Sequence, residues 1–200
     1  MRIRSKWNAR SKARSLEEVA GALAFIEWRI AGQTLLNLEN EGFQTDTQGQ
    51  RLDVLQELCA FLIHVTDRMT HESMDEEERQ RFIVALALKT ADHYHDNRID
   101  TEGDQDFRRA FIDTLNLRMA DYAEFRFVDG EPGYSSRRYL GERITNTMGE
   151  RDRKWISSQV MDIEIPEMLV TLKKGLTDLF VFGTGESESR RGGEATPQSS

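Results

Sequence analysis

Histidine and carboxylate side chains recur along one side of residues 52–72, the most apolar helical stretch of the chain. His64, Asp67 and His71 are separated by steps of three and four residues, which place them on one face of an α-helix together with Glu57. Imidazole and carboxylate groups bind zinc, iron and manganese, so these four residues form a candidate site for a divalent metal. The chain has neither Glu-x-x-His nor His-Glu-x-x-His. A polar face exposed to solvent is therefore the favoured interpretation of the same stripe.

Two further groups of residues are candidates for binding an anion. Arg118 lies between the inward-facing aromatic residues of its expected helix, and a buried arginine needs either an internal carboxylate or a bound anion. The run Ser135, Ser136, Arg137 and Arg138 stands at an expected helix start, where free N–H groups, hydroxyls and guanidinium groups hold phosphate in other proteins. The favoured interpretations are an internal salt bridge for Arg118 and an ordinary serine N-cap for the run.

The first fourteen residues form a basic segment without a single acidic residue. Its basic residues are Arg2, Arg4, Lys6, Arg10, Lys12 and Arg14. The whole chain nevertheless has a net charge of −8, so the remainder is strongly acidic and repels nucleic acid and anionic lipid. We expect segment 1–14 to be a flexible solvated arm. The alternatives are an arm that binds nucleic acid or another anion, and an organelle presequence.

Other chemistries have little support in the sequence. Cys59 is the single cysteine, which excludes an internal disulfide and favours a reducing compartment such as the cytoplasm. Motifs for a nucleophilic serine, a phosphate-binding loop or a dinucleotide site are absent from the sequence. No apolar run is long enough to span a membrane. We therefore expect no cofactor, apart from the divalent metal of the alternative interpretation.

The elements that would position these residues are predicted to be helices throughout. Capping-box patterns at residues 15–18 and 73–76 mark two helix starts, and no stretch alternates as a strand does. Helices are expected at 16–41, 52–72, 75–96 and 106–127, followed by two short helices and a last one whose first turn holds Pro166. The predicted fold is a single all-α, bundle-like domain of six or seven helices over residues 15–182, with a disordered tail at 183–200.

Two helices have apolar stripes that are typical of a seam between helices. In the first the stripe is Leu16, Val19, Leu23, Ile26 and Ile30, and in the last it is Ile165, Leu169, Leu172, Leu176 and Leu179. The first helix is longer than the others predicted, so part of its stripe is expected to lack a partner within the chain. The favoured hypothesis is a non-enzymatic protein–protein interaction or adaptor module that forms a homodimer through one of these helices. The alternative is that both stripes pack inside one monomer.

Overall fold

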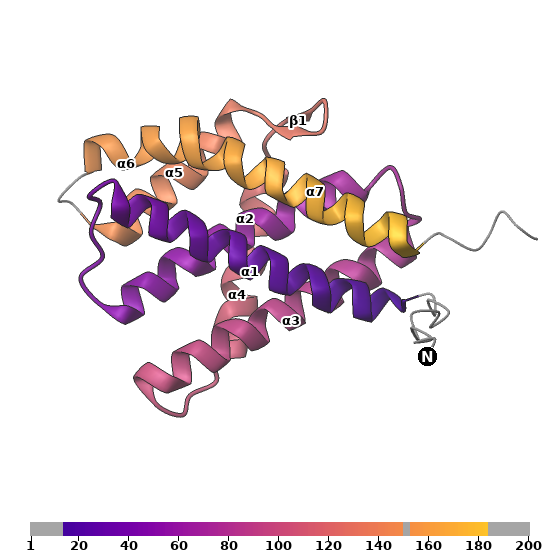
Figure 1. Cartoon of the computed structure of the whole chain (residues 1–200), viewed down its shortest axis with the longest axis horizontal. Helices are drawn as coiled ribbons and strands as arrows, with labels where there is room; N and C mark the ends of the chain where they lie inside the picture. The colour runs from indigo at the N-terminus through magenta and orange to yellow at the C-terminus, as the bar shows by residue number, and fades with distance from the viewer. Residues whose placement is uncertain (1–13, 150–152, 184–200) are drawn as a thin grey trace, which may run out of the picture.

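The computed structural model describes residues 14–149 and 153–183, and within them the chain is almost entirely helical (Figure 1). The helices in chain order are α1 (Leu16–Asn40), α2 (Gln48–Thr70), α3 (Glu76–Glu102), α4 (Phe107–Ala123), α5 (Tyr134–Met148), α6 (Arg153–Gln159) and α7 (Ile165–Gly183). This confirms the predicted all-α, bundle-like fold. The predicted arm, apart from Arg14, and the predicted tail after Gly183 lie outside the described residues.

The capping residues set where the first and third helices begin. Ser15 accepts a hydrogen bond from the backbone N–H of Glu18, and the Glu18 carboxylate accepts one from the backbone N–H of Ser15, which is the predicted capping box. The second predicted box, at residues 73–76, is wrong. Asp75 caps α3 instead, because its carboxylate accepts from the N–H of Glu78 at 2.8 Å, while the Ser73 hydroxyl donates to the Thr70 carbonyl.

Helix α3 is longer than predicted, because residues 97–102, which the sequence indicated as loop, continue the helix. Arg98 explains the difference. Its guanidinium pairs with Asp53 on α2 and, at 3.0 Å, with Glu102, and it lies over the ring of Phe107. These tertiary contacts keep a polar segment helical until Gly103, whose φ of +83° ends the helix.

A hairpin follows α4, where the sequence predicted a longer helix and no strand. The strands β1 (Phe127–Val128) and β2 (Glu131–Pro132) pair antiparallel around Asp129 and Gly130. Both turn residues have positive φ, of 54° and 73°, which is the conformation of a two-residue hairpin turn. Asp-Gly is a strong signal for this turn, so the sequence did contain the information that the hairpin forms.

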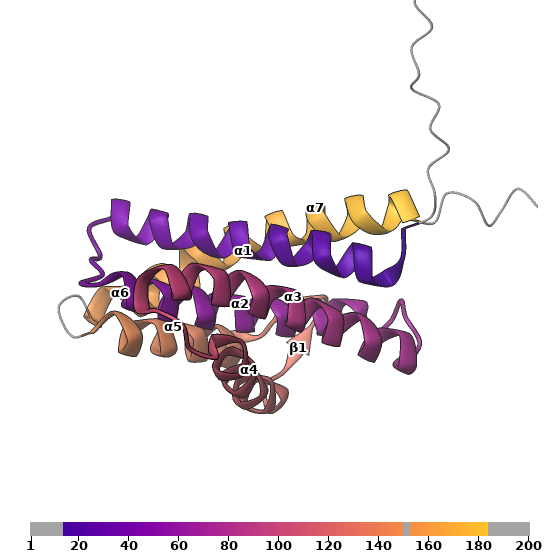
Figure 2. The same cartoon turned by 90° about the horizontal axis from the view of Figure 1, so that it is seen from below.

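Helix α2, which contains most of the apolar stretch 52–72, is the central helix. Most of its residues are buried, and it contacts α1, α3, α4 and α5. Figure 2 shows α1 and α7 side by side along one face of the molecule, with α4 crossing α3 on the opposite face. Buried apolar residues from all of these helices form one continuous core.

The last two helices are joined without a break in the chain path. A π-helical turn, η1 (Val160–Glu164), connects α6 to α7, so that α6, η1 and α7 form one bent helix. Pro166 has no N–H to donate to the helix ladder, and it lies just after this wider turn. None of the helices in the described ranges is both long enough and apolar enough to cross a membrane.

Candidate functional site

The inner half of the predicted metal stripe is buried in contacts with protein. Glu57 and His64 are each 5% exposed, so the favoured interpretation of a solvent-exposed polar face is wrong for these two residues. The His64 ring stacks on the ring of Tyr122, with 5.1 Å between centroids. Burial and then the charge of Arg68 lower the pKa of His64 to about 4, so its imidazole is neutral at physiological pH.

The other two residues of the predicted metal stripe, Asp67 and His71, have different surroundings. Asp67 pairs with Arg79 of α3, whereas His71 is exposed at the C-cap of α2. In the ranges 14–149 and 153–183, no three His, Cys, Asp or Glu side chains are grouped closely enough to hold a metal ion. The structure therefore does not bring the predicted ligands together, and we derive no metal chemistry from them.

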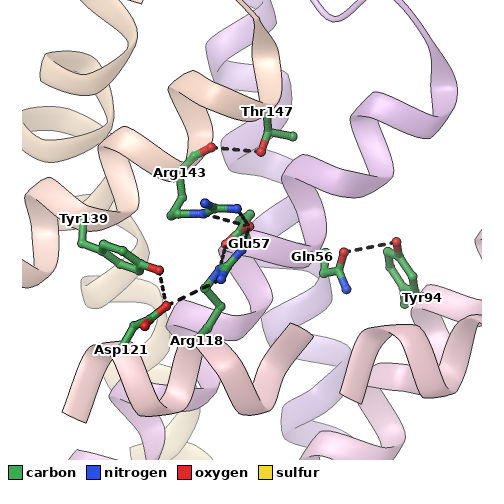
Figure 3. A network of polar contacts seen from close by, with 8 residues as sticks. All are labelled: Gln56, Glu57, Tyr94, Arg118, Asp121, Tyr139, Arg143 and Thr147. Atoms are coloured by element: carbon green, nitrogen blue, oxygen red, sulfur yellow. Dashed lines mark hydrogen bonds and ion pairs between the residues drawn. The ribbon is translucent and has the colours of Figure 1, made fainter. Parts of the chain in front are cut away.

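Glu57 instead forms the buried centre of a charge cluster between α2, α4 and α5 (Figure 3). Arg118 of α4 donates two hydrogen bonds of 2.7 Å, one to each Glu57 carboxylate oxygen. Arg143 of α5 donates to one of these oxygens, from Nη2 at 2.9 Å and Nε at 3.2 Å. The hydrogen bonds to Glu57 raise the pKa of Arg118 despite the opposing effect of burial. Arg118 thus forms the internal salt bridge of the favoured interpretation.

Neighbouring side chains bring the charge of this cluster close to balance. Asp121 lies 3.6 Å from Arg118 and accepts a hydrogen bond from the Tyr139 hydroxyl. The Tyr122 hydroxyl is buried beside them without a hydrogen-bond partner among the described residues, and burial raises its pKa well above the usual range. Two guanidinium groups therefore face two carboxylates. These charges balance, so the cluster connects three helices rather than forming an anion site.

A second buried carboxyl group, Glu27, was not among the residues that the sequence singled out. It lies on α1, is completely buried, and accepts a 2.7 Å hydrogen bond from the Thr66 hydroxyl of α2. Its other oxygen has no partner in the described part of the chain. Burial raises the pKa of Glu27 to about 8, so the group is protonated at neutral pH. Glu27 comes four residues after Leu23 and three before Ile30, which places it beside the apolar seam of α1. This spacing is the signal by which the sequence could have indicated its burial.

The serine–arginine run does not assemble the predicted phosphate site. Helix α5 begins at Tyr134 with Gly133 as its N-cap, so neither Ser135 nor Ser136 caps it. Ser135 is exposed, whereas the Ser136 hydroxyl is buried without a partner among the described residues.

The guanidinium groups of the run are both taken up by protein acceptors. Arg137 donates to the Pro132 carbonyl and to Glu131, each at 2.9 Å, and Arg138 donates to Glu142 at 2.8 Å. The two arginines therefore stabilise the hairpin and the first turns of α5.

The apolar stripes of the first and last helices pack inside the monomer. Every stripe residue of α7 is at most 8% exposed, and in α1 Val19, Leu23 and Ile30 are buried as well. The two helices run antiparallel: Asn37 near the end of α1 donates to Glu164, the residue just before α7, whereas Ile26 packs against Gly175 within α7. The expectation that the first helix has an unpaired seam is therefore wrong for these stripe residues.

A different face of α1 remains open to solvent. It borders a groove of about 580 Å³ between α1 and α7, to which Phe25, Arg29, Gly32 and Leu36 contribute. These four residues follow one another at steps of four, three and four along the helix. Phe25 is 53% exposed and Leu36 is 46% exposed. We call these four residues the outer stripe.

The centre of the outer stripe allows a close approach. A Cβ atom added at Gly32 would meet nothing within 4 Å, so the backbone there faces open space. The Arg29 guanidinium lies over the ring of Phe25, 5.9 Å from its centroid. The stripe thus has a large apolar residue at each end, with an arginine and a glycine between them.

Comparison with models of known families, with curated proteins and with solved structures gives no match to this chain.

Proposed function

We propose that this chain is a non-enzymatic helical interaction module that acts as a homodimer, with the outer stripe of α1 at the dimer axis. The observation that carries the proposal is the symmetry of the stripe. Phe25 and Leu36 are equally far from the midpoint between Ile30 and Ala31, and so are Arg29 and Gly32. A sequence arranged in this way is complementary to itself when two copies run antiparallel.

The pairing that follows is sterically sensible. In an antiparallel pair, Phe25 of each copy lies opposite Leu36 of the other, so that the most exposed apolar residues of α1 cover one another. Arg29 lies opposite the open backbone at Gly32, which leaves room for its long side chain. Both copies use the same surface in this contact, as a two-fold axis requires.

The other polar groups favour a binding role over catalysis. Glu57 is saturated by two arginines, Glu27 is inaccessible to any solute, and His64 is buried against a tyrosine. A catalytic group has to reach the atom it acts on, and these groups face protein. The free cysteine, Cys59, is consistent with work in a reducing compartment such as the cytoplasm.

Light scattering tests the proposal directly. The chain mass is 23.1 kDa, and we expect twice that mass at micromolar concentration. Phe25→Glu and Leu36→Glu should each give the monomer mass, because they place a charge in the centre of an apolar contact. Leu88→Glu on α3 is the matched control, since Leu88 is 55% exposed but lies outside the stripe, and it should leave the dimer intact. A wild-type chain of monomer mass contradicts the proposal.

Engineered cysteines test the antiparallel register. We expect the double variant Phe25→Cys/Leu36→Cys to form a covalent dimer on mild oxidation, because the thiol at position 25 of one copy lies opposite the thiol at position 36 of the other. Each single variant should stay uncrosslinked. A parallel arrangement differs in the single variants, both of which would then crosslink. Cys59 is completely buried and does not compete.

A further inference from the structure

A second hollow lies where α2 and α7 meet, away from the outer stripe. Its volume is about 540 Å³, and Met69, Met74, Leu176 and Phe180 supply its apolar lining. We call these four residues the methionine hollow. Methionine side chains adapt their shape and make favourable contacts with aromatic rings. Lys173 also borders the hollow, but its ammonium group is paired with Glu131 at 2.9 Å.

Acidic residues surround the turn that leads from the methionine hollow into α3. Glu72, Glu77 and Glu78 are all exposed, and none forms an ion pair with a described residue. We call these three residues the acidic corner. The basic residue nearest to it in sequence, Arg79, is already engaged by Asp67 and Glu76. A ligand with an aromatic anchor and several positive charges would complement both features.

The start of α1 lies close to these two features. Glu17 in the first turn of α1 pairs with Arg81 of α3 at 3.3 Å, and the next residue, Phe82, packs on Phe180 with 5.6 Å between ring centroids. Two consecutive residues of α3 thus connect the beginning of α1 to the methionine hollow. In Figure 1 the first turn of α1, the last turns of α7 and the turn between α2 and α3 lie at the same end of the molecule.

The segment that precedes α1 has a composition complementary to the methionine hollow and the acidic corner. Residues 1–13 contain Arg2, Arg4, Lys6, Arg10 and Lys12, no acidic residue, and Trp7 as their one large aromatic residue. Trp7 is separated from Ser15 by a stretch of chain that can span up to about 26 Å when extended. That length is well above the width of a helix, about 10 Å, and the first turn of α1 lies at the same end of the molecule as the last turns of α7.

We propose that segment 1–13 binds to its own chain, with Trp7 in the methionine hollow and its basic residues on the acidic corner. The occupant is the segment of the same chain, because a short tether holds it at an effective concentration in the millimolar range. This contact does not depend on the outer stripe or on the dimer. Its electrostatic part weakens with salt, because ions screen exposed charges.

Methyl NMR of the full-length chain with labelled methionines tests this proposal. The ring current of Trp7 should shift the methyl signals of Met69 and Met74 upfield in the wild type, and Trp7→Ala should abolish the shift. The methyl signal of Met119, which lies outside the hollow, is the control and should not move. Equal Met69 and Met74 signals in wild type and Trp7→Ala overturn the proposal.

Two further variants test the contribution of the charges and ask whether the bound arm belongs to the same chain. Replacing all three residues of the acidic corner by glutamine should reduce the shift and remove its dependence on salt. In the monomeric variant Phe25→Glu the shift should persist unchanged on dilution. A shift that disappears on dilution would show that the arm of another copy fills the hollow, which overturns binding within one chain. Because this readout does not require dimerisation, it is independent of the test of the proposed function.

Discussion

Glu27 and His64 are buried without an ion-pair partner among the described residues, and both are neutral near pH 7. Burial raises the pKa of Glu27 and lowers the pKa of His64. For Glu27 the pKa is raised to about 8 in the folded chain, from an ordinary value of 4.5. Its stabilising contribution is complete below the ordinary value and is lost as pH rises through about 8. For His64 the pKa falls to about 4, so its contribution is complete above the ordinary value of 6.5 and is lost as pH falls toward 4.

The first prediction concerns Glu27→Gln. The amide has nearly the shape of the protonated carboxyl but does not ionise, so the variant should lose the decline in stability between pH 5 and about pH 8. Relative to wild type, its free energy of unfolding should rise across this range by a few kcal/mol, with a slope of at most about 1.4 kcal/mol per pH unit, the limit for one titrating group. Urea unfolding at several pH values measures this. Glu124→Gln, at an exposed position, is the control and should follow the wild-type curve.

The second prediction concerns His64→Phe. Phenylalanine keeps an aromatic ring against Tyr122 but has no proton to gain, so acid should destabilise this variant less than wild type between pH 6.5 and about 4. The difference should approach about 1–3 kcal/mol at the acid end. Thermal unfolding followed by circular dichroism at pH 7 and pH 4.5 measures it. Parallel losses in both proteins would show that His64 is not the group responsible.

Single residues were the hardest part of this molecule to predict. The sequence placed Arg118 among aromatic residues and indicated an internal carboxylate partner, but it did not identify Glu57 as that partner. The spacing of His64, Asp67 and His71 was correct for one helix face. It could not show that Tyr122, Arg79 and solvent would each meet a different member of the stripe. Which helix covers which face is decided by packing between distant segments, and a local pattern does not contain it.

At the scale of elements, local sequence signals predicted an element's start or end correctly where the interacting residues belong to that same element. The box at Ser15 and Glu18 predicted the start of α1, because both groups belong to one turn. The length of α3 was underestimated because its last turns depend on Asp53, a residue of another helix. The hairpin was missed because its four strand residues are too few for an alternating pattern, although Asp129-Gly130 marked its turn.

The third prediction tests how tightly α5 and α6 are packed. A Cβ atom at Gly141 would lie 2.6 Å from the Ser157 hydroxyl oxygen and 3.0 Å from the Ser157 carbonyl oxygen, so Gly141→Ala must push the two helices apart. We expect a loss of about 1–3 kcal/mol in the free energy of unfolding. Gly21→Ala on α1 is the matched control, because its Cβ would meet nothing within 4 Å. It should stabilise the chain by about 0.5–1 kcal/mol. Chemical denaturation of both variants decides between packing and helix propensity.

At the scale of the whole molecule, the sequence predicted the helical bundle but not how the helices pair. The stripes of the first and last helices were both correctly identified as seams, yet neither one specifies its partner. They pack in the same monomer around Ile26 and Gly175. The surface left over is the outer stripe, which is polar at Arg29 and small at Gly32 and therefore gives a weak apolar signal.

The fourth prediction follows from the proposed dimer. If two copies associate when folded and separate when unfolded, the melting temperature should rise with protein concentration, by several degrees over about a hundredfold range. Calorimetry at several concentrations measures this. Phe25→Glu should make the melting temperature independent of concentration, whereas Leu88→Glu should retain the dependence. A wild-type melting temperature that stays constant would exclude coupling between folding and association.

Cys59 gives this chain an internal reporter of its own opening. It is the single cysteine, it lies on the central helix, and it is completely buried. Burial also raises the pKa of the thiol, so the reactive thiolate is scarce in the closed state. An alkylating reagent can therefore modify the native chain only when α2 separates from its neighbours. The rate of mass increase in its presence measures how often the core opens, without any label or substitution in the protein.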